Sequence, residues 1–341
     1  MTGNAKRRVL IVGAGGFLGS HLLERAVGIP GLEVYAGVRA STSDRYFPKE
    51  GVTRVDFDFE DPADVERTLT TTLPEGEKCD LIVYNLGATK CLRYKDFDHI
   101  NHDLLRTFVE TLERTGTMPE KFLYISSLSA MGPGDPRSYT PFSETMVPQP
   151  NTRYGASKLK AEMLLQMHPV PYIIFRCTGI YGPRDHDYFM MFDAMRKGFD
   201  FSVGFRRQLL TFIYAPDLAE AVFTALEKAP AKEVYNIAEP RAYSQAEFRR
   251  IAASKLGRKI VIPVKVPLWG TKVVSWVAEK IGVVRGKPST LNTDKYNIMK
   301  QRNWSADTRK AREAFGFTAS TPLAKGVEQS IEWYRKEGWM K

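Results

Sequence analysis

The first half of the chain alternates short apolar runs with helical patterns, and this alternation constrains the fold more than any other feature. We predict six β-strands, at Arg8–Val12, Glu33–Val38, Val52–Phe57, Asp80–Tyr84, Lys121–Ile125 and Tyr172–Phe175. The helical patterns between them are Leu18–Val27, Ala63–Leu73, His102–Arg114 and Tyr154–Met167. Several strands are almost wholly apolar, which is typical of strands buried on both faces. The alternation therefore predicts an α/β fold with a doubly wound parallel sheet.

The pattern changes after Cys177, where proline and glycine become frequent and helices mix with irregular segments. We predict helices at Ala215–Glu227, Ser244–Leu256 and Leu323–Arg335, the last with one apolar face that should pack on the rest of the protein. The expected organisation is a nucleotide-binding domain over residues 1–177, to which residues 212–238 return. A smaller C-terminal substrate lobe would occupy most of residues 178–341.

Composition excludes several classes of protein. With 43% hydrophobic and 26% charged residues in 341, the chain has the balance of a globular protein and not of a disordered one. It has no run of the about 18 uncharged apolar residues that a membrane helix needs, and no secretory signal is expected. Its three cysteines are widely spaced, which favours reduced thiols in a cytoplasmic protein. The net charge of +10 favours anionic partners.

A glycine-rich turn follows the first predicted strand and opens the first predicted helix. Gly13, Gly16 and Gly19 are three positions apart within it. Backbone without a Cβ can approach a pyrophosphate closely, and the free N–H groups of the following helix then face the phosphates. A tight strand–helix turn without a ligand is the plain alternative. Because both flanking elements are present, we predict a dinucleotide site in a Rossmann fold.

The end of the second strand should select the form of the cofactor. An acid there would bind the ribose hydroxyls of NAD, whereas an arginine accommodates the 2′-phosphate of NADP. Arg39 occupies this place and Ser41 follows it, with no acid at this strand end. NADP(H) is therefore the preferred cofactor, NAD(H) remains an alternative, and the loop could also be a solvated basic turn. Asp58, after the third strand, could reach the adenine edge or serve as a turn residue.

Tyr154 and Lys158 are four positions apart at the start of a predicted helix, so they share one helix face. A lysine ammonium, helped by the positive ring of nicotinamide, would lower the pKa of a tyrosine phenol from its usual value of about 10. Ser127 and Ser129 follow the fifth strand, at the edge of a parallel sheet where ligands bind. Simple turn chemistry is the alternative for these serines. The combination predicts an acid–base tyrosine beside a serine that holds the substrate oxygen.

With these motifs in this order, the chain resembles the extended short-chain dehydrogenase/reductase superfamily, the NAD-dependent epimerase/dehydratase group, over nearly its whole length. The resemblance implies that Ser127 and Tyr154 polarise the reacting oxygen and that Lys158 binds the nicotinamide ribose. It implies a part in the proton relay for Asn101. Cys177 stands where the family has a proline. Besides the glycines, Arg39, Ser41, Asp58, Tyr154 and Lys158, the implied cofactor contacts are Phe17, Leu18, Phe59, Leu86, Gly87, Cys177 and Ile180, and the implied substrate contacts are Ser129 and Tyr181.

The substrate class depends on a stretch that in nucleotide-sugar epimerases carries an arginine for the diphosphate. This chain has Leu209, Leu210 and Thr211 at the matching place, although Arg206 and Arg207 stand nearby. Without that fixed cation, a nucleotide-sugar is disfavoured. The stretch is more similar to the hydroxysteroid dehydrogenase and dihydroflavonol reductase branch, so an apolar substrate is expected.

A second feature pointing to an apolar substrate lies in residues 267–284. Apolar side chains recur there at helical spacing, interrupted by two lysines and a glutamate (Lys272, Lys280 and Glu279): Trp269, Val273, Trp276, Val277 and Ile281. A helix docked in the substrate lobe is the plain interpretation. A substrate lid, an oligomer surface and a membrane-facing patch are the alternatives.

These features together predict an NADP(H)-dependent oxidoreductase that interconverts an alcohol and a ketone by hydride transfer, on an apolar cyclic substrate such as a hydroxysteroid. One alternative is a nucleotide-sugar epimerase or dehydratase with tightly bound NAD, and another is a non-catalytic NADP-binding protein. We expect a small-molecule substrate and no nucleic acid partner. Weak peripheral contact with a membrane and a homodimer are left open. The five histidines have no metal-ligand spacing, so no metal is expected.

Overall fold

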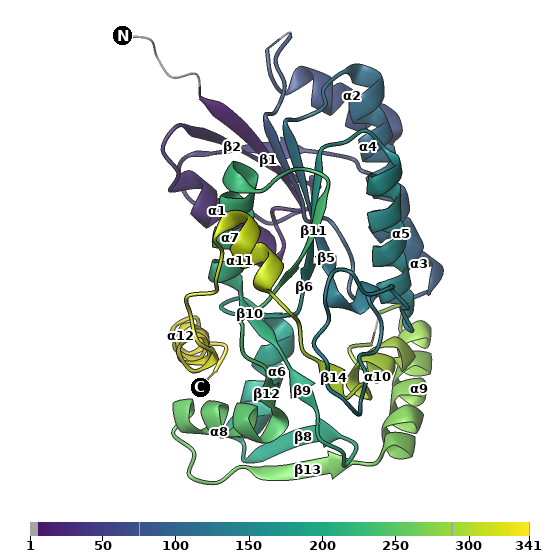
Figure 1. Cartoon of the computed structure of the whole chain (residues 1–341), viewed down its shortest axis with the longest axis vertical. Coiled ribbons are helices and arrows are strands. Elements are labelled where there is room, and N and C mark those ends of the chain that lie inside the picture. The colour runs from purple at the N-terminus through teal and green to yellow at the C-terminus, as the bar shows by residue number, and fades with distance from the viewer. Residues whose placement is uncertain (1–5, 75, 288, 341) are drawn as a thin grey trace.

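The computed structural model describes residues 6–74, 76–287 and 289–340, and its centre is one seven-stranded parallel sheet (Figure 1). The strand order is β11-β6-β5-β4-β1-β2-β3, which confirms the predicted doubly wound fold. The strands are β1 (Arg7–Val12), β2 (Leu32–Val38), β3 (Val52–Asp56), β4 (Leu81–Tyr84), β5 (Lys121–Ser127), β6 (Tyr172–Cys177) and β11 (Glu233–Ile237). The order in which successive strands are added to the sheet reverses between β1 and β4. Parallel sheets bind ligands in the crevice that forms at such a point.

Helices cover both faces of the sheet. One face carries α1 (Phe17–Val27), α7 (Ala215–Lys228) and α11 (Arg309–Phe315). The other carries α2 (Pro62–Thr71), α4 (Leu104–Thr115) and α5 (Arg153–Met167). Three short pieces complete this domain: α3 (Lys95–Asp98), the π-helical turn η1 (His99–Asp103) and the 3₁₀ turn η2 (Leu128–Ala130). Each face therefore buries its own apolar core, and the strands between them are apolar on both sides.

The remaining elements form a smaller lobe at the carboxyl edge of the sheet, the lower part of Figure 1. Its helices are α6 (His186–Arg196), α8 (Gln245–Lys255), α9 (Leu268–Val284), α10 (Thr293–Met299) and α12 (Leu323–Lys336). Its small sheets pair β7 (Gly179–Tyr181) with β10 (Phe212–Tyr214), β8 (Phe199–Val203) with β13 (Ile262–Val266), and β9 (Leu209–Leu210) with β12 (Tyr243–Ser244) and β14 (Asn303–Trp304). Phe192, Phe248 and Tyr334 lie in its core.

The chain crosses between the two parts more than once. After the first lobe segment it returns through α7, which packs beside α1, and through β11, which adds an edge to the sheet next to β6. β10, at the start of the expected returning segment 212–238, pairs with β7 outside the main sheet. No helix within the described part of the chain is long and apolar enough to cross a bilayer.

Candidate functional site

Gly13, Gly16 and Gly19 have different structural roles where β1 leads into α1. Gly13 has a φ of +80°, and a Cβ on it would lie 2.8 Å from the backbone nitrogen of Leu86. A Cβ on Gly19 would lie 2.4 Å from the carbonyl oxygen of Gly13, so only glycine lets α1 come this close to the turn. The space in front of Gly16 is open, because the nearest atom to its Cβ position is 3.5 Å away. With no acid in the first turn of α1, this cradle fits a pyrophosphate.

Phe17 and Leu18 open α1 directly after this cradle. Phe17 is half-buried, with its ring edge-on to the ring of His21. Leu18 is buried in the core beneath the sheet. Leu18 can therefore reach a cofactor only through its backbone.

Arg39 and Ser41 are exposed in the turn after β2. Arg54 on β3 holds this turn, donating to the carbonyl oxygens of Arg39 (3.2 Å), Ala40 (3.1 Å) and Thr42 (2.9 Å). The guanidinium of Arg39 has no carboxylate partner among the described residues. A fixed backbone with an unpaired cation at the end of β2 fits a ribose 2′-phosphate.

Asp58 has the role of a turn residue in this structure. It is exposed, its carboxylate accepts from the backbone N–H of Glu60 at 3.1 Å, and Asp61 rather than Asp58 caps α2. Phe59 is buried, with its ring stacked 5.0 Å from that of Phe57. The side chain of Phe59 therefore belongs to the core beside the nucleotide edge of the sheet.

Lys158 lies in the centre of the predicted site, nearly sealed from solvent. Its Nζ donates to the carbonyl oxygen of Ile125 at 2.8 Å and to Oη of Tyr124 at 3.1 Å, and it lies over the Tyr124 ring. Burial lowers the pKa of Lys158 to about 8, an effect that nearby Cys177 and Glu162 oppose. The ammonium is thus held by β5, at the height of the predicted nicotinamide pocket.

Tyr154 is positioned by tight packing at the start of α5. Thr152 caps the helix by accepting from the N–H of Gly155 at 2.9 Å. A Cβ on Gly155 would lie 2.2 Å from the carbonyl oxygen of Ser129, so glycine lets α5 pack directly on η2. This contact places the start of α5, which carries Tyr154, against η2, the turn that directly follows Ser127.

The pKa of Tyr154 differs from the expectation. Burial raises it to about 12, while a hydrogen bond with Ser127 lowers it in part. The prediction that Lys158, helped by the nicotinamide ring, lowers this pKa stays a prediction, since in this structure the Lys158 ammonium donates to Tyr124 and Ile125. Any further fall in the phenol's pKa has to come from a charge that binds with the cofactor.

Asn101 is buried and fastens a loop. Its Nδ2 donates to the carbonyl oxygen of Ala88 (3.0 Å) and to Oγ of Ser157 (2.9 Å), and its Oδ1 accepts from the N–H of Ala88 (2.8 Å). A Cβ on Gly87 would lie 2.9 Å from Oδ1 of Asn101 and 3.3 Å from Nζ of Lys158. Asn101 therefore ties the loop holding Leu86 and Gly87 to α5 and keeps it beside Lys158. These bonds give Asn101 a positioning role, and its implied part in a proton relay stays a prediction.

The resemblance implies contacts with the cofactor or substrate for three residues at the end of β6 and just after it: Cys177, Ile180 and Tyr181. Cys177 is buried beside Lys158, whose charge lowers the thiol pKa in part, although burial raises it overall to about 12. Ile180 is half-buried against the core on the α1 face of the sheet. Tyr181 does not support its implied substrate contact: it is 2% exposed in the core of the lobe. Gly326 leaves room for it, since a Cβ there would lie 2.2 Å from its Oη. Ser129 is nearly buried in η2.

Sequence reasoning missed Asp294, which joins the lobe to the catalytic helix. Its carboxylate accepts from the backbone N–H groups of Arg153 at 2.7 Å and Tyr154 at 3.1 Å. An acid at a helix N-terminus accepts hydrogen bonds from free backbone N–H groups, and its negative charge interacts favourably with the helix dipole. Asp294 lies on α10, far along the chain from α5, so no local pattern could have revealed the contact. Tyr124, which accepts from Lys158, carried no signal beyond its place in an apolar strand.

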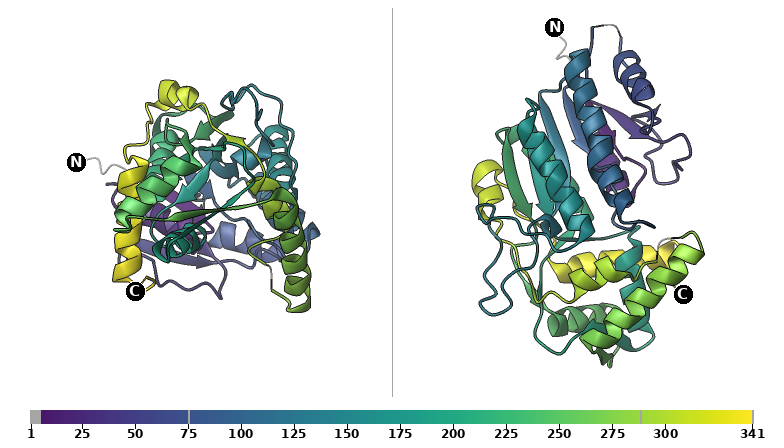
Figure 2. Two further views of the ribbon diagram at one scale, coloured as in Figure 1. Left: turned by 90° about the horizontal axis from the view of Figure 1, so that it is seen from below. Right: turned by 90° about the vertical axis from the view of Figure 1, so that its right-hand side faces the viewer.

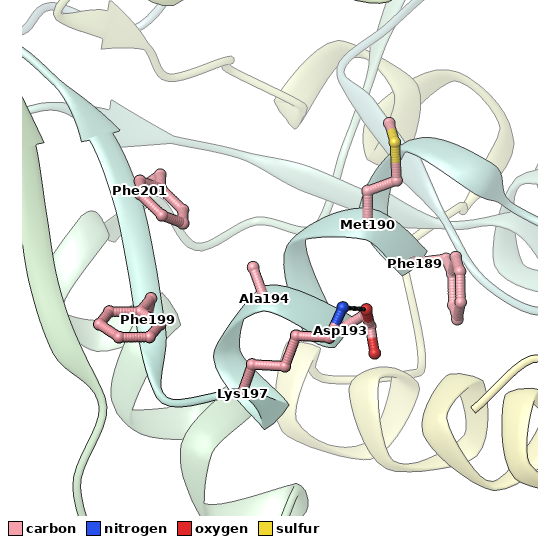
Figure 3. A pocket seen from close by; sticks show the side chains of 7 residues that line it. All are labelled: Phe189, Met190, Asp193, Ala194, Lys197, Phe199 and Phe201. Atoms are coloured by element: carbon pink, nitrogen blue, oxygen red, sulfur yellow. Dashed lines mark ion pairs between the residues drawn. The ribbon is translucent and has the colours of Figure 1, made fainter. Parts of the chain in front are cut away.

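The described part of the chain forms hollows on the lobe and at its border with the sheet domain. One, of about 260 Å³, opens between the loop after β4 and α9. It is lined by Cys91, Leu92, Arg93, Tyr94, Phe97, Glu279, Val283 and Asn292. The ring of Phe97 is 6.2 Å from that of Tyr154, so this hollow adjoins the site. The other, of about 360 Å³, lies between α6 and β8, is lined by Phe189, Met190, Asp193, Ala194, Lys197, Phe199 and Phe201, and includes none of the predicted site residues (Figure 3).

A family model described as the NAD-dependent epimerase/dehydratase family matches residues 9–238, which span the glycine turn, the serines and the Tyr154–Lys158 pair. The chain belongs to this family. It is 24% identical to dTDP-D-glucose 4,6-dehydratase of Mus musculus, over 98% of the chain and 90% of that protein. It is also 24% identical to the ceramide reductase of Caulobacter vibrioides, over 100% of the chain and 98% of that protein.

Solved structures of this fold agree. The dTDP-glucose 4,6-dehydratase of Bacillus anthracis in complex with NAD superposes with a TM-score of 0.76 at 17% identity, covering 98% of each chain. These relatives confirm an enzyme of the extended short-chain dehydrogenase/reductase type that uses a nicotinamide cofactor. They do not support the expected hydroxysteroid dehydrogenase or dihydroflavonol reductase branch. Most of them are named as nucleotide-sugar enzymes, which favours the alternative function over the principal one.

Proposed function

We propose that the protein is an NADP(H)-dependent oxidoreductase that interconverts an alcohol and a ketone on an apolar, lipid-like substrate. The observation that carries this proposal is the hollow lined by Leu92, Phe97 and Val283 together with polar side chains, because the ring of Phe97 lies 6.2 Å from that of Tyr154. The nearly full-length similarity to a ceramide reductase supports the same class. A long-chain ketone or carbinol replaces the cyclic substrate that the sequence suggested.

In this reaction Tyr154 transfers the proton of the substrate oxygen and Ser127 orients that oxygen. Lys158, held by Tyr124 and Ile125, binds the nicotinamide ribose and supplies a positive charge below the tyrosine. The cofactor supplies the hydride and, in its oxidised form, a second positive charge near the phenol. Asn101 keeps the loop over this site at its observed distance from α5.

The preference for NADP(H) rests on Arg39. The turn that carries it is fixed by Arg54, so its cation stands at the end of β2 without an internal partner among the described residues. A phosphate in this position forms a charge-assisted bond, typically worth about 1.5–3 kcal/mol. Related structures have been solved with NAD, so the proposed preference for NADP(H) depends on Arg39 of this chain and not on the fold.

The apolar substrate class rests on what lies near the site. Leu210 is half-buried in β9 where a diphosphate-binding arginine would stand. Arg206 and Arg207 are exposed, and the side chain of Arg207 lies over the ring of Tyr139. Desolvating a diphosphate without a fixed cation costs several kcal/mol, whereas an apolar chain gains about 25 cal/mol for each Å² it buries.

A nucleotide-sugar enzyme is the second candidate, because most of the relatives carry such names. Within it, an epimerase fits the residues better than a dehydratase. Eliminating water requires a further acid–base group next to the tyrosine. Residues 126–132, which follow β5 beside Tyr154, contain no acid and no histidine.

Turnover measurements separate these candidates. Long-chain ketones and UDP- or dTDP-sugars are offered to the protein with NADPH or NADH, and absorbance reports oxidation of the cofactor. Oxidation of NADPH by a long-chain ketone, lost in Tyr154→Phe, supports the proposal. Conversion of a nucleotide-sugar without net cofactor oxidation, detected by chromatography, would replace it with the epimerase function. A protein that binds NADPH and converts neither class would be the non-catalytic alternative.

A further inference from the structure

Helix α9 is amphipathic, but it buries its small and polar side chains and exposes its large apolar ones. Its small or polar residues Thr271, Ser275 and Gly282 face the protein and are buried. Its large apolar residues face outward, with Trp269 75% exposed and Trp276 56% exposed. A soluble helix normally buries its apolar stripe, so this arrangement indicates a surface that is covered in the working protein.

The outward face forms one continuous stripe. Its members recur at helical spacing along α9, with one adjacent pair: Trp269, Val273, Trp276, Val277, Ile281 and Val284. The edge strand β13 leads directly into this helix and adds the exposed Ile262, and Phe201 on the neighbouring β8 is 59% exposed. Exposed apolar side chains therefore occur on β8 and β13 as well as on α9, the helix at the lower right of Figure 1.

Positively charged residues are frequent in the segment that carries this surface. Residues 258–287 contain seven lysines and arginines and one acid, Glu279. Lys272 and Lys280 are exposed on α9 itself, and Lys280 lies over the ring of Trp276. Glu279 is taken up inside, accepting from Oη of Tyr94 and from the N–H of Thr293. The outward face thus combines tryptophans, aliphatic side chains and unopposed cations, which is the composition of a helix that lies in a membrane interface.

We infer that α9 docks the protein on an anionic lipid surface, with its axis along the bilayer plane. A bilayer takes up the apolar stripe while phospholipid head groups neutralise the lysines around it. A second copy of the chain fits less well, because a twofold contact through α9 would bring the same cations together. The helix lies on the outside of the lobe in both views of Figure 2 and is free to meet such a surface.

The inner edge of α9 connects this surface to the site. Glu279 and Val283 line the hollow that adjoins Tyr154 through Phe97. The chain then passes from α9 into α10, whose Asp294 caps the catalytic helix. This second half of the inference rests on the proposed function: a lipid-like substrate would leave the bilayer along α9 and enter the hollow without crossing water.

Vesicle co-sedimentation of the full chain tests the docking directly. Vesicles of phosphatidylcholine are compared with vesicles that also contain phosphatidylglycerol. We expect binding to the anionic vesicles, a more than tenfold loss in Trp269→Glu/Trp276→Glu, and a loss of more than about fivefold for each lysine reversed in Lys272→Glu/Lys280→Glu. Met167→Glu replaces an equally exposed apolar residue on α5 and Lys49→Glu/Lys228→Glu reverses two distant lysines, and both should bind as the wild type does.

Two results would overturn the inference. One is equal partition of wild type and the α9 variants into anionic vesicles, or none at all. The other is a lipid-independent dimer in sedimentation velocity that the α9 variants dissociate, which would assign the face to a second copy. Circular dichroism confirms that each variant is folded. Turnover of a water-soluble short-chain ketone is measured in parallel: vesicle binding without any ketone turnover would refute the proposed function and leave the docking intact.

Discussion

Replacing Lys158 with methionine should abolish turnover and, at neutral pH, relieve an electrostatic penalty in the cofactor-free fold. The side chain is 5% exposed, and its positive charge has no carboxylate within ion-pair distance among the described residues. Methionine has a similar length and no charge to desolvate. Lys158 is thus a residue kept for function at a cost to stability.

The size of the effect follows from the pKa. Burial lowers the pKa of Lys158 from its usual 10.5 to about 8, which corresponds to roughly 3 kcal/mol at neutral pH. Because the folded-state pKa lies below the unfolded one, the unfolded chain binds more protons between about pH 8 and 10.5. This contribution therefore makes the wild type more stable as pH rises through that window. The variant also loses the hydrogen bonds from Lys158 to Tyr124 and Ile125. This loss offsets about 1–3 kcal/mol of its gain in folding stability, independently of pH.

Urea unfolding of wild type and Lys158→Met at pH 7 and pH 10 measures this directly. The stability difference between them should shift by roughly 2–3 kcal/mol in favour of the wild type at the higher pH. Other titrating groups are common to both proteins and cancel in the difference. Lys160→Met, which removes an exposed lysine on the same helix, should show no such shift. A difference for Lys158→Met that stays constant within about 0.5 kcal/mol across this range would refute the argument that the ammonium is desolvated.

Three further substitutions test the site. Tyr154→Phe should lower turnover by about 10²–10⁴-fold while cofactor affinity, measured by calorimetry, stays unchanged; retention of most of the wild-type kcat would contradict the acid–base role. Arg39→Asp should weaken NADP(H) binding by about ten- to a hundredfold and spare NAD(H), and equal affinities of both cofactors for the wild type would reduce Arg39 to a surface charge. Asp294→Ala should cost about 1–2 kcal/mol in urea unfolding by uncapping α5. An unchanged unfolding curve would show that the bonds from Arg153 and Tyr154 contribute nothing to stability.

Local patterns in the sequence were sufficient for six of the seven strands of the sheet, all except β11, and for the nucleotide-binding turn. A strand buried on both faces must be apolar throughout, and a turn that touches phosphate must lack side chains, so both leave marks within a few residues. For this reason the predicted boundaries of α1, α5 and α7 lie within a residue or two of those observed. The predicted pairing of Tyr154 with Ser127 rests on the rule that strand ends and helix starts meet at one edge of a parallel sheet.

Contacts between distant segments depended on tertiary structure alone. Periodicity identified a helix around Trp269 and Trp276 but could not say which face is buried, because small residues on the opposite face pack against the lobe just as closely. The same limit applies to Tyr181, whose burial depends on a glycine in α12. The electrostatic effect of Lys158 depends on the position of its Nζ atom. The spacing of residues along a helix does not determine this position. Sequence therefore determined the scaffold, whose rules are local, while the electrostatics of the site and the exposed face of α9 were decided by packing.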